Sequence, residues 1–316
     1  MEQIGELIGV LTLVENTKNS LFLRRDNRIK SIHASLQIEN NTLSLEQVTA
    51  IISGKKVLGH PREIKEVQNA YDIYDKIEKL EPDSETHFLS AHNTLMSNID
   101  KESGKYRSGG VGILKGKDVV HIAPGADRVK FLMKDLFDWL KNSDEHPLIK
   151  SSVFHYETEF IHPFSDGNGR IGRLWQTVIL SKWKPLFVYL PVETVIRDNQ
   201  YEYYSVLGEA DNLGDCTCFV EFMLSMIYKS LTDIKSDQVG DYVSDQVKEL
   251  LVVLNNQVLS PSEIMKKLSL SHRTNFRKNY LNPALKSGLI EMTNPDKPSS
   301  SNQKYRLTLK GQGKIK

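Results

Sequence analysis

The stretch FIHPFSDGNGRIGRLW, residues 160–175, brings a histidine, an aspartate, small residues and two arginines close together. Gly167 and Gly169 flank Asn168 just before a helix that we expect from Gly169 to Trp183. Glycine allows the tight turn that such a junction needs, and the backbone N–H groups at the positive end of a helix bind anions. This segment therefore predicts a phosphate-binding loop.

The polar side chains around this loop predict a group-transfer reaction. Arg170 and Arg173 are three residues apart on one helix face, where two guanidinium groups can bind phosphate oxygens. Asp166 is a lone carboxylate beside them, which suits a Mg²⁺ ion that is otherwise bound by waters and phosphates. His162 can take a proton from a hydroxyl at neutral pH. Singly, these residues are common in turns, cores and solvated helix faces, but together they predict transfer of a phosphate-containing group from a nucleotide to a hydroxyl.

The run HPF-S-D-G-N-G-R-I-G-R resembles the signature of the Fic family, HPF-x-(D/E)-GNGR-x-x-R, at every specified position. Members of that family mostly transfer AMP from ATP to Ser, Thr or Tyr hydroxyls of proteins. The resemblance covers about residues 20–230 and implies a protein adenylyltransferase that uses ATP and Mg²⁺. It implies that His162 is the base, that Asp166 holds the Mg²⁺ and that Phe164 anchors the loop in the core. The implied nucleotide-binding residues are Asp166, Gly167, Asn168, Gly169, Arg170, Ile171, Gly172 and Arg173.

A second family pattern, (S/T)-x-x-x-E-(G/N), is similar to SLQIEN, which has Ser35, Glu39 and Asn40 at that spacing. In members that carry it upstream of the main motif, a helix N-terminal to the core inhibits the enzyme. The resemblance implies an inhibitory helix at about 26–40 whose Glu39 occupies Arg173, the ligand of the γ-phosphate. Two alternatives stay open: the same glutamate could orient a water that removes AMP from modified proteins, or the site could use another nucleotide donor.

Two β-like runs around a turn at 115–117 predict a hairpin within about 105–125. This hairpin resembles the family's flap, which pairs with a segment of the target protein. The residues implied for docking are Val111, Gly112, Ile113, Val119, Val120 and His121. The stretch QYEYYSVLGEAD resembles the family segment beside the adenine, which makes Tyr203, Tyr204 and Asp211 candidates for the nucleotide site.

Composition indicates an ordinary soluble globular protein, with 39% hydrophobic and 26% charged residues in 316. No window approaches the roughly 18 apolar residues of a membrane span. The N-terminus lacks the basic start and apolar centre of a secretory signal, so we expect a cytoplasmic protein without a membrane partner. Cys216 and Cys218 are too few for a disulfide scaffold and are expected to be reduced.

The expected fold is mainly α, in two domains. Residues 1–235 have helical patterns and the predicted hairpin, as in a Fic-type helical core with a β-hairpin flap. Residues 243–316 show three helices followed by two short strands, the outline of a winged helix-turn-helix domain.

The C-terminal region is basic, with twelve Lys and Arg against three Asp and Glu from Gln257 to Lys316. Arg273, Arg277 and Lys278 are candidate DNA contacts on its recognition helix, so a DNA-binding transcriptional regulator is a second hypothesis for the chain. The alternative is a domain used only for protein contacts or dimerisation. The expected partners are a target protein with a modifiable hydroxyl, the chain itself as a substrate, DNA, and a second copy in a homodimer.

Overall fold

The computed structural model describes residues 1–14, 20–110, 112–115, 118–241, 245–255, 257–270, 272–295, 297, 300 and 302–313. The chain divides into two compact units, Met1–Ile234 and Lys235–Lys316. The buried hydrophobic clusters of the first unit contain no residue of the second, which has a cluster of its own. Among the described helices, none is both long and apolar enough to cross a bilayer.

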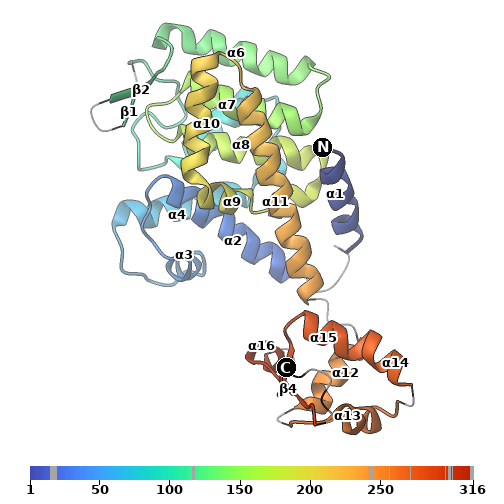
Figure 1. The fold of residues 1–316 in the computed structure, drawn as a ribbon. Helices are drawn as coiled ribbons and strands as arrows, with labels where there is room; N and C mark the ends of the chain where they lie inside the picture. The colour runs from blue at the N-terminus through green and yellow to red at the C-terminus, as the bar shows by residue number, and fades with distance from the viewer. Residues whose placement is uncertain are drawn as a thin grey trace. The chain divides into compact units, whose positions relative to one another are not determined.

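The first unit is built from helices and one hairpin (Figure 1). Its helices are α1 (Glu2–Val14), α2 (Ser20–Ile38), α3 (Leu45–Ile52), α4 (Pro61–Tyr74), α5 (Glu85–Leu95), α6 (Ala126–Asn142), α7 (Pro147–Ile161), α8 (Asn168–Trp183), α9 (Val192–Asp198), α10 (Gln200–Leu213) and α11 (Thr217–Asp241), with the 3₁₀ turns η1 (Ile77–Lys79) and η2 (Pro185–Tyr189). The expected mainly α fold class is thus confirmed.

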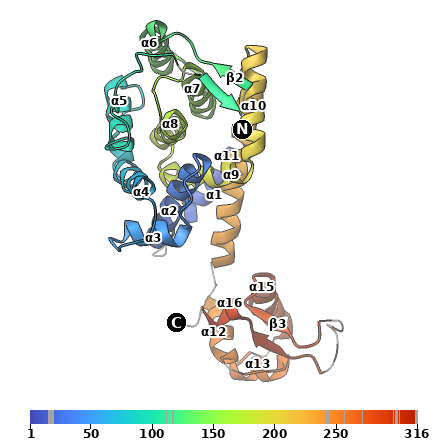
Figure 2. The same cartoon turned by 90° about the vertical axis from the view of Figure 1, so that its left-hand side faces the viewer.

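Helix α8 lies in the interior of this unit, beside α7 (Figures 1 and 2). Every residue from Ile171 to Ser181 is buried, which explains why the sequence has no amphipathic pattern here. Phe88 of α5 packs edge-on against Trp175 of α8, with 5.0 Å between the ring centroids. This packing fixes the start of α8, where the glycine-rich loop ends.

The predicted inhibitory helix is α2, and it differs in extent from the expected 26–40. It begins at Ser20 and ends at Ile38, so Glu39 and Asn40 lie in the turn that follows it. Asn40 adopts φ 64°, a left-handed conformation that asparagine tolerates better than most residues and that ends helices. Glu39 is therefore carried by a turn anchored to a long helix.

The predicted hairpin is present as β1 (Gly112–Lys115) and β2 (Asp118–Ile122), which pair antiparallel. Gly112 pairs with Ile122 and Lys115 with Asp118, with an irregularity between Ile113 and Leu114. Val111 lies outside the described residues.

The second unit has the element order expected of the C-terminal domain. It consists of α12 (Asp245–Leu254), α13 (Pro261–Lys267), α14 (Arg273–Phe276), the π-helical turn η3 (Arg277–Leu281), α15 (Asn282–Lys286), the antiparallel strands β3 (Ile290–Met292) and β4 (Tyr305–Leu307), and α16 (Leu309–Gln312). Leu250, Phe276 and Ile290 are in its core. Because α14, η3 and α15 follow one another directly, they form the third helical segment before the strands.

Candidate active site

The loop between α7 and α8 is closed by its own asparagine. The Asn168 side chain accepts a hydrogen bond from the Phe164 N–H and donates one to the Phe164 carbonyl, both at 2.9 Å. Phe164 is fully buried and stacks on His92, with 3.5 Å between ring centroids. The Asn168 side chain is thus committed to the loop, and only its backbone N–H is left to act on an anion at the start of α8.

His92 of α5 supports the same loop, although sequence reasoning did not single it out. The Gly104 N–H donates to Nδ1 at 2.9 Å, so the proton of the neutral ring is on Nε2, which lies 2.9 Å from the Asp166 carbonyl oxygen. Burial is the main reason that the pKa of His92 is lowered to about 4. The ring is therefore neutral near pH 7 and keeps both hydrogen bonds.

His162 ends α7 in a left-handed conformation with φ 50°. Its Nδ1 lies 3.3 Å from the carbonyl oxygen of Glu159. Because a carbonyl can only accept, Nδ1 carries the proton in this contact and the lone pair lies on Nε2. This is the tautomer that a general base requires.

A carboxylate of the chain itself lies beside Gly169 in the first turn of α8. Gly167 adopts φ +87°, which favours glycine, and Gly169 begins the first turn of α8. A Cβ added at Gly169 would clash with the Glu39 carboxylate and would lie 2.9 Å from Nη1 of Arg173. The absence of a side chain at Gly169 thus leaves room for an oxygen of Glu39 beside the first turn of α8, next to the Arg173 guanidinium.

Arg173 binds the end of α2 through three contacts. Its Nη2 lies 2.7 Å from Oε1 of Glu39, and its Nε and Nη2 donate to the hydroxyl and carbonyl oxygens of Ser35, each at 3.1 Å. Arg173 is 2% exposed. Burial alone would lower the pKa of Arg173, but the charges of Glu39 and Glu159 help to offset this and the pKa is raised. The structure thus brings together Ser35, Glu39 and Arg173, as the family pattern implies.

Asp166 and Arg170 form an ion-pair network with α4. Asp166 pairs with Nη2 of Arg170 through Oδ1 and with Nη2 of Arg62 through Oδ2, both at 2.8 Å. Arg170 also lies 3.3 Å from Glu66 and is 5% exposed. Arg170 is therefore held between two carboxylates here, and its role as a phosphate ligand stays a prediction.

The carboxylate of Asp166 suits a Mg²⁺ ion whose other ligands are waters and substrate phosphates. Among the described side chains, no cluster of three or more His, Cys, Asp and Glu is placed to bind a metal. Mg²⁺ usually keeps several waters and shares substrate phosphates, so one carboxylate suffices. Asp166 is partly exposed, and its partner Arg62 is more than half exposed, so the guanidinium can move away from Oδ2.

The three residues predicted to lie beside the adenine differ in burial and in their hydrogen-bond partners. Tyr203 is 1% exposed, and its hydroxyl contacts His155 and Glu159 inside the core. Tyr204 is 50% exposed, with its hydroxyl 3.4 Å from the carbonyl oxygen of Ile38. Asp211 accepts a hydrogen bond from Tyr156 at 2.9 Å. Of the two tyrosines, Tyr204 is thus the exposed one, and its hydroxyl lies beside the last residue of α2.

Other predicted site residues lie as follows. Ile171 is fully buried, and a Cβ at Gly172 would approach His155 to 3.0 Å, so both shape the packing of α8. The docking residues Gly112 and Ile113 are on β1, and Val119, Val120 and His121 are on β2. Arg273, Arg277 and Lys278 are exposed in the second unit.

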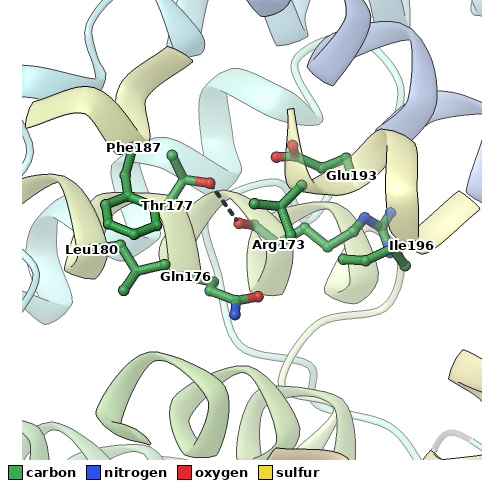
Figure 3. A pocket seen from close by; sticks show the side chains of 8 residues that line it. Arg173, Gln176, Thr177, Leu180, Phe187, Glu193 and Ile196 are labelled. Carbon is green, nitrogen blue, oxygen red and sulfur yellow. Dashed lines mark hydrogen bonds between the residues drawn. The ribbon is translucent and has the colours of Figure 1, made fainter. Parts of the chain in front are cut away.

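A small cavity of about 10 Å³ lies behind Arg173, bounded by side chains of α8, η2 and α9 (Figure 3). That volume suits a single water and excludes a nucleotide. Glu193 in its wall is 2% exposed and accepts a hydrogen bond from Tyr74 at 3.0 Å. Burial raises the pKa of Glu193. This cavity is therefore too small to be the nucleotide site, although Arg173 lines it.

The fold and the site together describe a helical domain with an oxyanion position at a glycine-rich loop and a histidine beside it. The sequence profile of the Fic/DOC family matches residues 82–180, and that of the C-terminal domain of Fic-like proteins (filamentation induced by cAMP) matches residues 245–308. The crystal structure of a Fic family protein from Desulfovibrio desulfuricans is 55% identical, covers 98% of this chain and 95% of its own, and has a TM-score of 0.73. The chain belongs to the Fic family.

Curated relatives are similar over part of their length. The protein adenylyltransferase Fic of Nematostella vectensis is 29% identical over 204 residues, which are 61% of this chain and 45% of that protein. The protein adenylyltransferase fic-1 of Caenorhabditis elegans is 30% identical over 213 residues, 64% of this chain and 40% of that protein. The chain thus spans less than half the length of these relatives.

Proposed function

We propose that this protein transfers AMP from ATP to a hydroxyl side chain of a target protein, and that Glu39 inhibits the reaction. The observation that carries the proposal is the position of the Glu39 carboxylate, over Gly169 and 2.7 Å from Arg173. Arg173, the expected phosphate ligand, thus binds a carboxylate of the chain itself. The names of the curated relatives support adenylyl transfer as the reaction.

In the proposed reaction, the target hydroxyl oxygen attacks the α-phosphorus of ATP, the bond to the bridging oxygen of the β-phosphate breaks, and pyrophosphate leaves. Nε2 of His162 accepts the hydroxyl proton. The backbone N–H groups at the start of α8 and the Arg173 guanidinium hold phosphate oxygens. Asp166 would hold the Mg²⁺ ion, which would supply positive charge to the leaving pyrophosphate. The rate then depends on positioning, because little covalent chemistry is left to the protein.

Glu39 inhibits this reaction by competition for Arg173. A hydrogen bond between charged groups contributes about 2 kcal/mol. This corresponds to a change of roughly thirtyfold in the ratio of Arg173 bound to Glu39 to Arg173 bound to the ATP phosphate. ATP that cannot displace Glu39 binds with its terminal phosphate elsewhere, so its α-phosphorus is out of line with the incoming hydroxyl. Removal of the carboxylate therefore activates the enzyme.

The test is Glu39→Gly incubated with α-labelled ATP, Mg²⁺ and cell lysate. We expect labelling of target proteins, or of the chain itself, to rise at least about tenfold over the unsubstituted protein. Glu145→Gly is the matched control, because Glu145 is exposed in the connection between α6 and α7 and far along α7 from His162. Glu39→Gly combined with His162→Ala should abolish the label.

Unchanged labelling in Glu39→Gly would contradict the inhibitory role. Label from γ-labelled ATP but not from α-labelled ATP would show that the enzyme transfers a phosphoryl group. Incubation of pre-labelled proteins with the unsubstituted enzyme tests the reverse reaction: loss of label that requires Glu39 would show AMP removal as the main activity.

A second candidate function is DNA binding by the second unit. Arg273, Arg277 and Lys278 are all exposed on one helical segment. We expect retardation of random duplex DNA at low salt, with affinity falling steeply as salt rises. Arg273→Ala with Arg277→Ala should reduce the salt dependence, and unaltered duplex mobility at low salt would exclude this function.

A further inference from the structure

Arg107 contacts two separate parts of the first unit. It lies in the segment before β1 and is 3% exposed. On one side, its Nε donates to the His162 carbonyl at 2.7 Å and its Nη2 donates to the Ile161 carbonyl at 3.2 Å. Its backbone N–H donates to the Pro163 carbonyl at 2.9 Å. One residue thus binds three consecutive carbonyl groups at the end of α7.

On its other side, Arg107 binds both ends of the hairpin. Nη1 donates to the Gly109 carbonyl at 2.8 Å, and Nη2 forms a short hydrogen bond to the Pro124 carbonyl. Gly109 lies shortly before β1 and Pro124 shortly after β2. The two chain segments that lead into and out of the hairpin are therefore held by the same guanidinium.

The charge of Arg107 is matched by backbone dipoles. Of the described carboxylates, none forms an ion pair with it. The carbonyl groups at the end of α7 carry the partial negative charge of the helix and have no partner within it. A forked group with five N–H donors can bind several such oxygens at once, whereas an ammonium group is a single point charge.

The backbone of His162 is in a strained conformation that needs outside support. A non-glycine residue with φ 50° is held there only by its surroundings, and the bond from Nε of Arg107 fixes the His162 carbonyl. The direction of the carbonyl determines how the peptide turns, and with it the direction of the imidazole. The contacts of Arg107 thus link the orientation of His162 to the position of the two segments that lead into and out of the hairpin.

We propose that Arg107 is a positioning residue that sets the hairpin at a fixed place relative to His162. This inference rests on the proposed function, in which His162 accepts the hydroxyl proton, and on the target-docking role that the family resemblance implies for the hairpin. Arg107 contacts neither the imidazole of His162 nor the target hydroxyl. It acts on the reaction only through backbone carbonyl groups. Its loss should therefore slow the transfer step while nucleotide binding at Arg173 stays as it was.

The test is Arg107→Lys in the Glu39→Gly background, compared with Arg128→Lys in the same background. Arg128 is exposed on α6, so its substitution keeps the same chemical change away from the site. We expect kcat for target labelling to fall about 10- to 100-fold with the KM for ATP changed less than about twofold, because misplaced reactants lose rate rather than affinity. We also expect at least about tenfold faster hydrogen exchange at the amides of β1 and β2, and a shift of the His162 ring signals in NMR spectra.

These measurements separate the two proposals. If Glu39→Gly alone transfers no label, the proposed function is wrong, and the exchange and NMR measurements still decide whether Arg107 couples the hairpin to His162. Identical kcat, exchange and ring signals in Arg107→Lys and Arg128→Lys would overturn the role of Arg107. Equal losses in kcat and in ATP affinity, together with faster hydrogen exchange throughout the first unit, would also overturn the role of Arg107. If Arg107→Lys does not fold, Arg107→Gln, which buries no charge, is subjected to the same measurements.

Discussion

Single residues of this site act mainly on the backbone of the loop. Asn168 closes the loop through Phe164, His92 binds the Asp166 carbonyl, and Arg107 binds the His162 carbonyl. A loop rich in glycine has a large conformational entropy when unfolded, so a preformed site needs such fixed contacts. The loop is thus held by hydrogen bonds between its backbone and these three side chains.

The buried His92 predicts a pH dependence of stability. Its pKa of about 4 in the folded protein lies below the ordinary value of about 6.5 in the unfolded chain, so the unfolded state binds more protons between these values. The stability that the neutral ring contributes is complete above pH 6.5 and is lost as the pH falls through 4. The loss should reach about 3 kcal/mol at most, measured as the free energy of urea unfolding from pH 7 to pH 4.

His155, which is fully buried with its pKa lowered to about 3, contributes in the same direction. The variant His92→Gln separates the two histidines, since it removes one titrating group and leaves the other. Its unfolding free energy should depend less on pH over the same range. A pH dependence equal to that of the unsubstituted protein would contradict the assignment to His92.

At the scale of elements, α2 is a core helix that also leads into the turn with Glu39, the proposed inhibitory residue. Ile32 is fully buried, and α2 packs on α3, α4 and α9. Its end is held by further contacts, from Gln200 Nε2 to the Ile38 carbonyl at 3.0 Å and from Arg197 to the Gln37 side chain at 2.9 Å. Relief of inhibition by departure of the whole helix would expose the core, so we expect relief to be local to the turn at Glu39.

This view predicts opposite behaviour for two substitutions in one segment. Ile32→Ala should lower the free energy of unfolding by about 2–5 kcal/mol, because it leaves a cavity in the core, and should raise labelling little. Glu39→Gly should raise labelling strongly and change stability by about 2 kcal/mol or less. Chemical denaturation and the α-label assay on both variants check the pair. Activation by Ile32→Ala as strong as by Glu39→Gly would show that the helix itself departs.

The limits of sequence reasoning differ between elements for physical reasons. Helix ends with local signals were predictable, such as α3, whose N-cap Ser44 forms a capping box with Gln47. The loop before α8 was also predictable, because its residues are adjacent in the chain. Arg107 was not predictable, since its partners lie up to 56 positions away and are backbone carbonyls, which leave no trace in residue type. Tyr203 and Tyr204 are adjacent tyrosines, so residue type does not distinguish them. Only the packing of the folded chain makes Tyr203 buried and Tyr204 half exposed.

At the scale of the whole molecule, the candidate site lies entirely in the first unit. The hydrophobic clusters of residues 4–231 share no member with the cluster of residues 247–307. Separate cores allow separate folding, because each unit buries its own apolar surface. The second unit thus has a hydrophobic core of its own, which shares no residue with the cores of the first unit.

This separation predicts the behaviour of a shortened chain. A chain that ends at Asp241 keeps α11 and every described residue of the site. In the Glu39→Gly background it should keep label transfer to itself within about twofold, and calorimetry should show one unfolding transition fewer than the full chain. Loss of transfer in a shortened chain that still unfolds cooperatively would mean that the second unit contributes to the reaction.

The contact between Glu39 and Arg173 also has a genetic consequence. Codons for glutamate and glycine differ at a single base, so one point mutation suffices to remove the carboxylate that lies 134 positions before its partner. Under the proposed inhibition by Glu39, alleles with unrestrained activity arise easily, whereas restoring restraint requires one particular residue at one particular turn. In a population where excess transfer slows growth, selection would maintain Glu39 as strictly as it maintains His162.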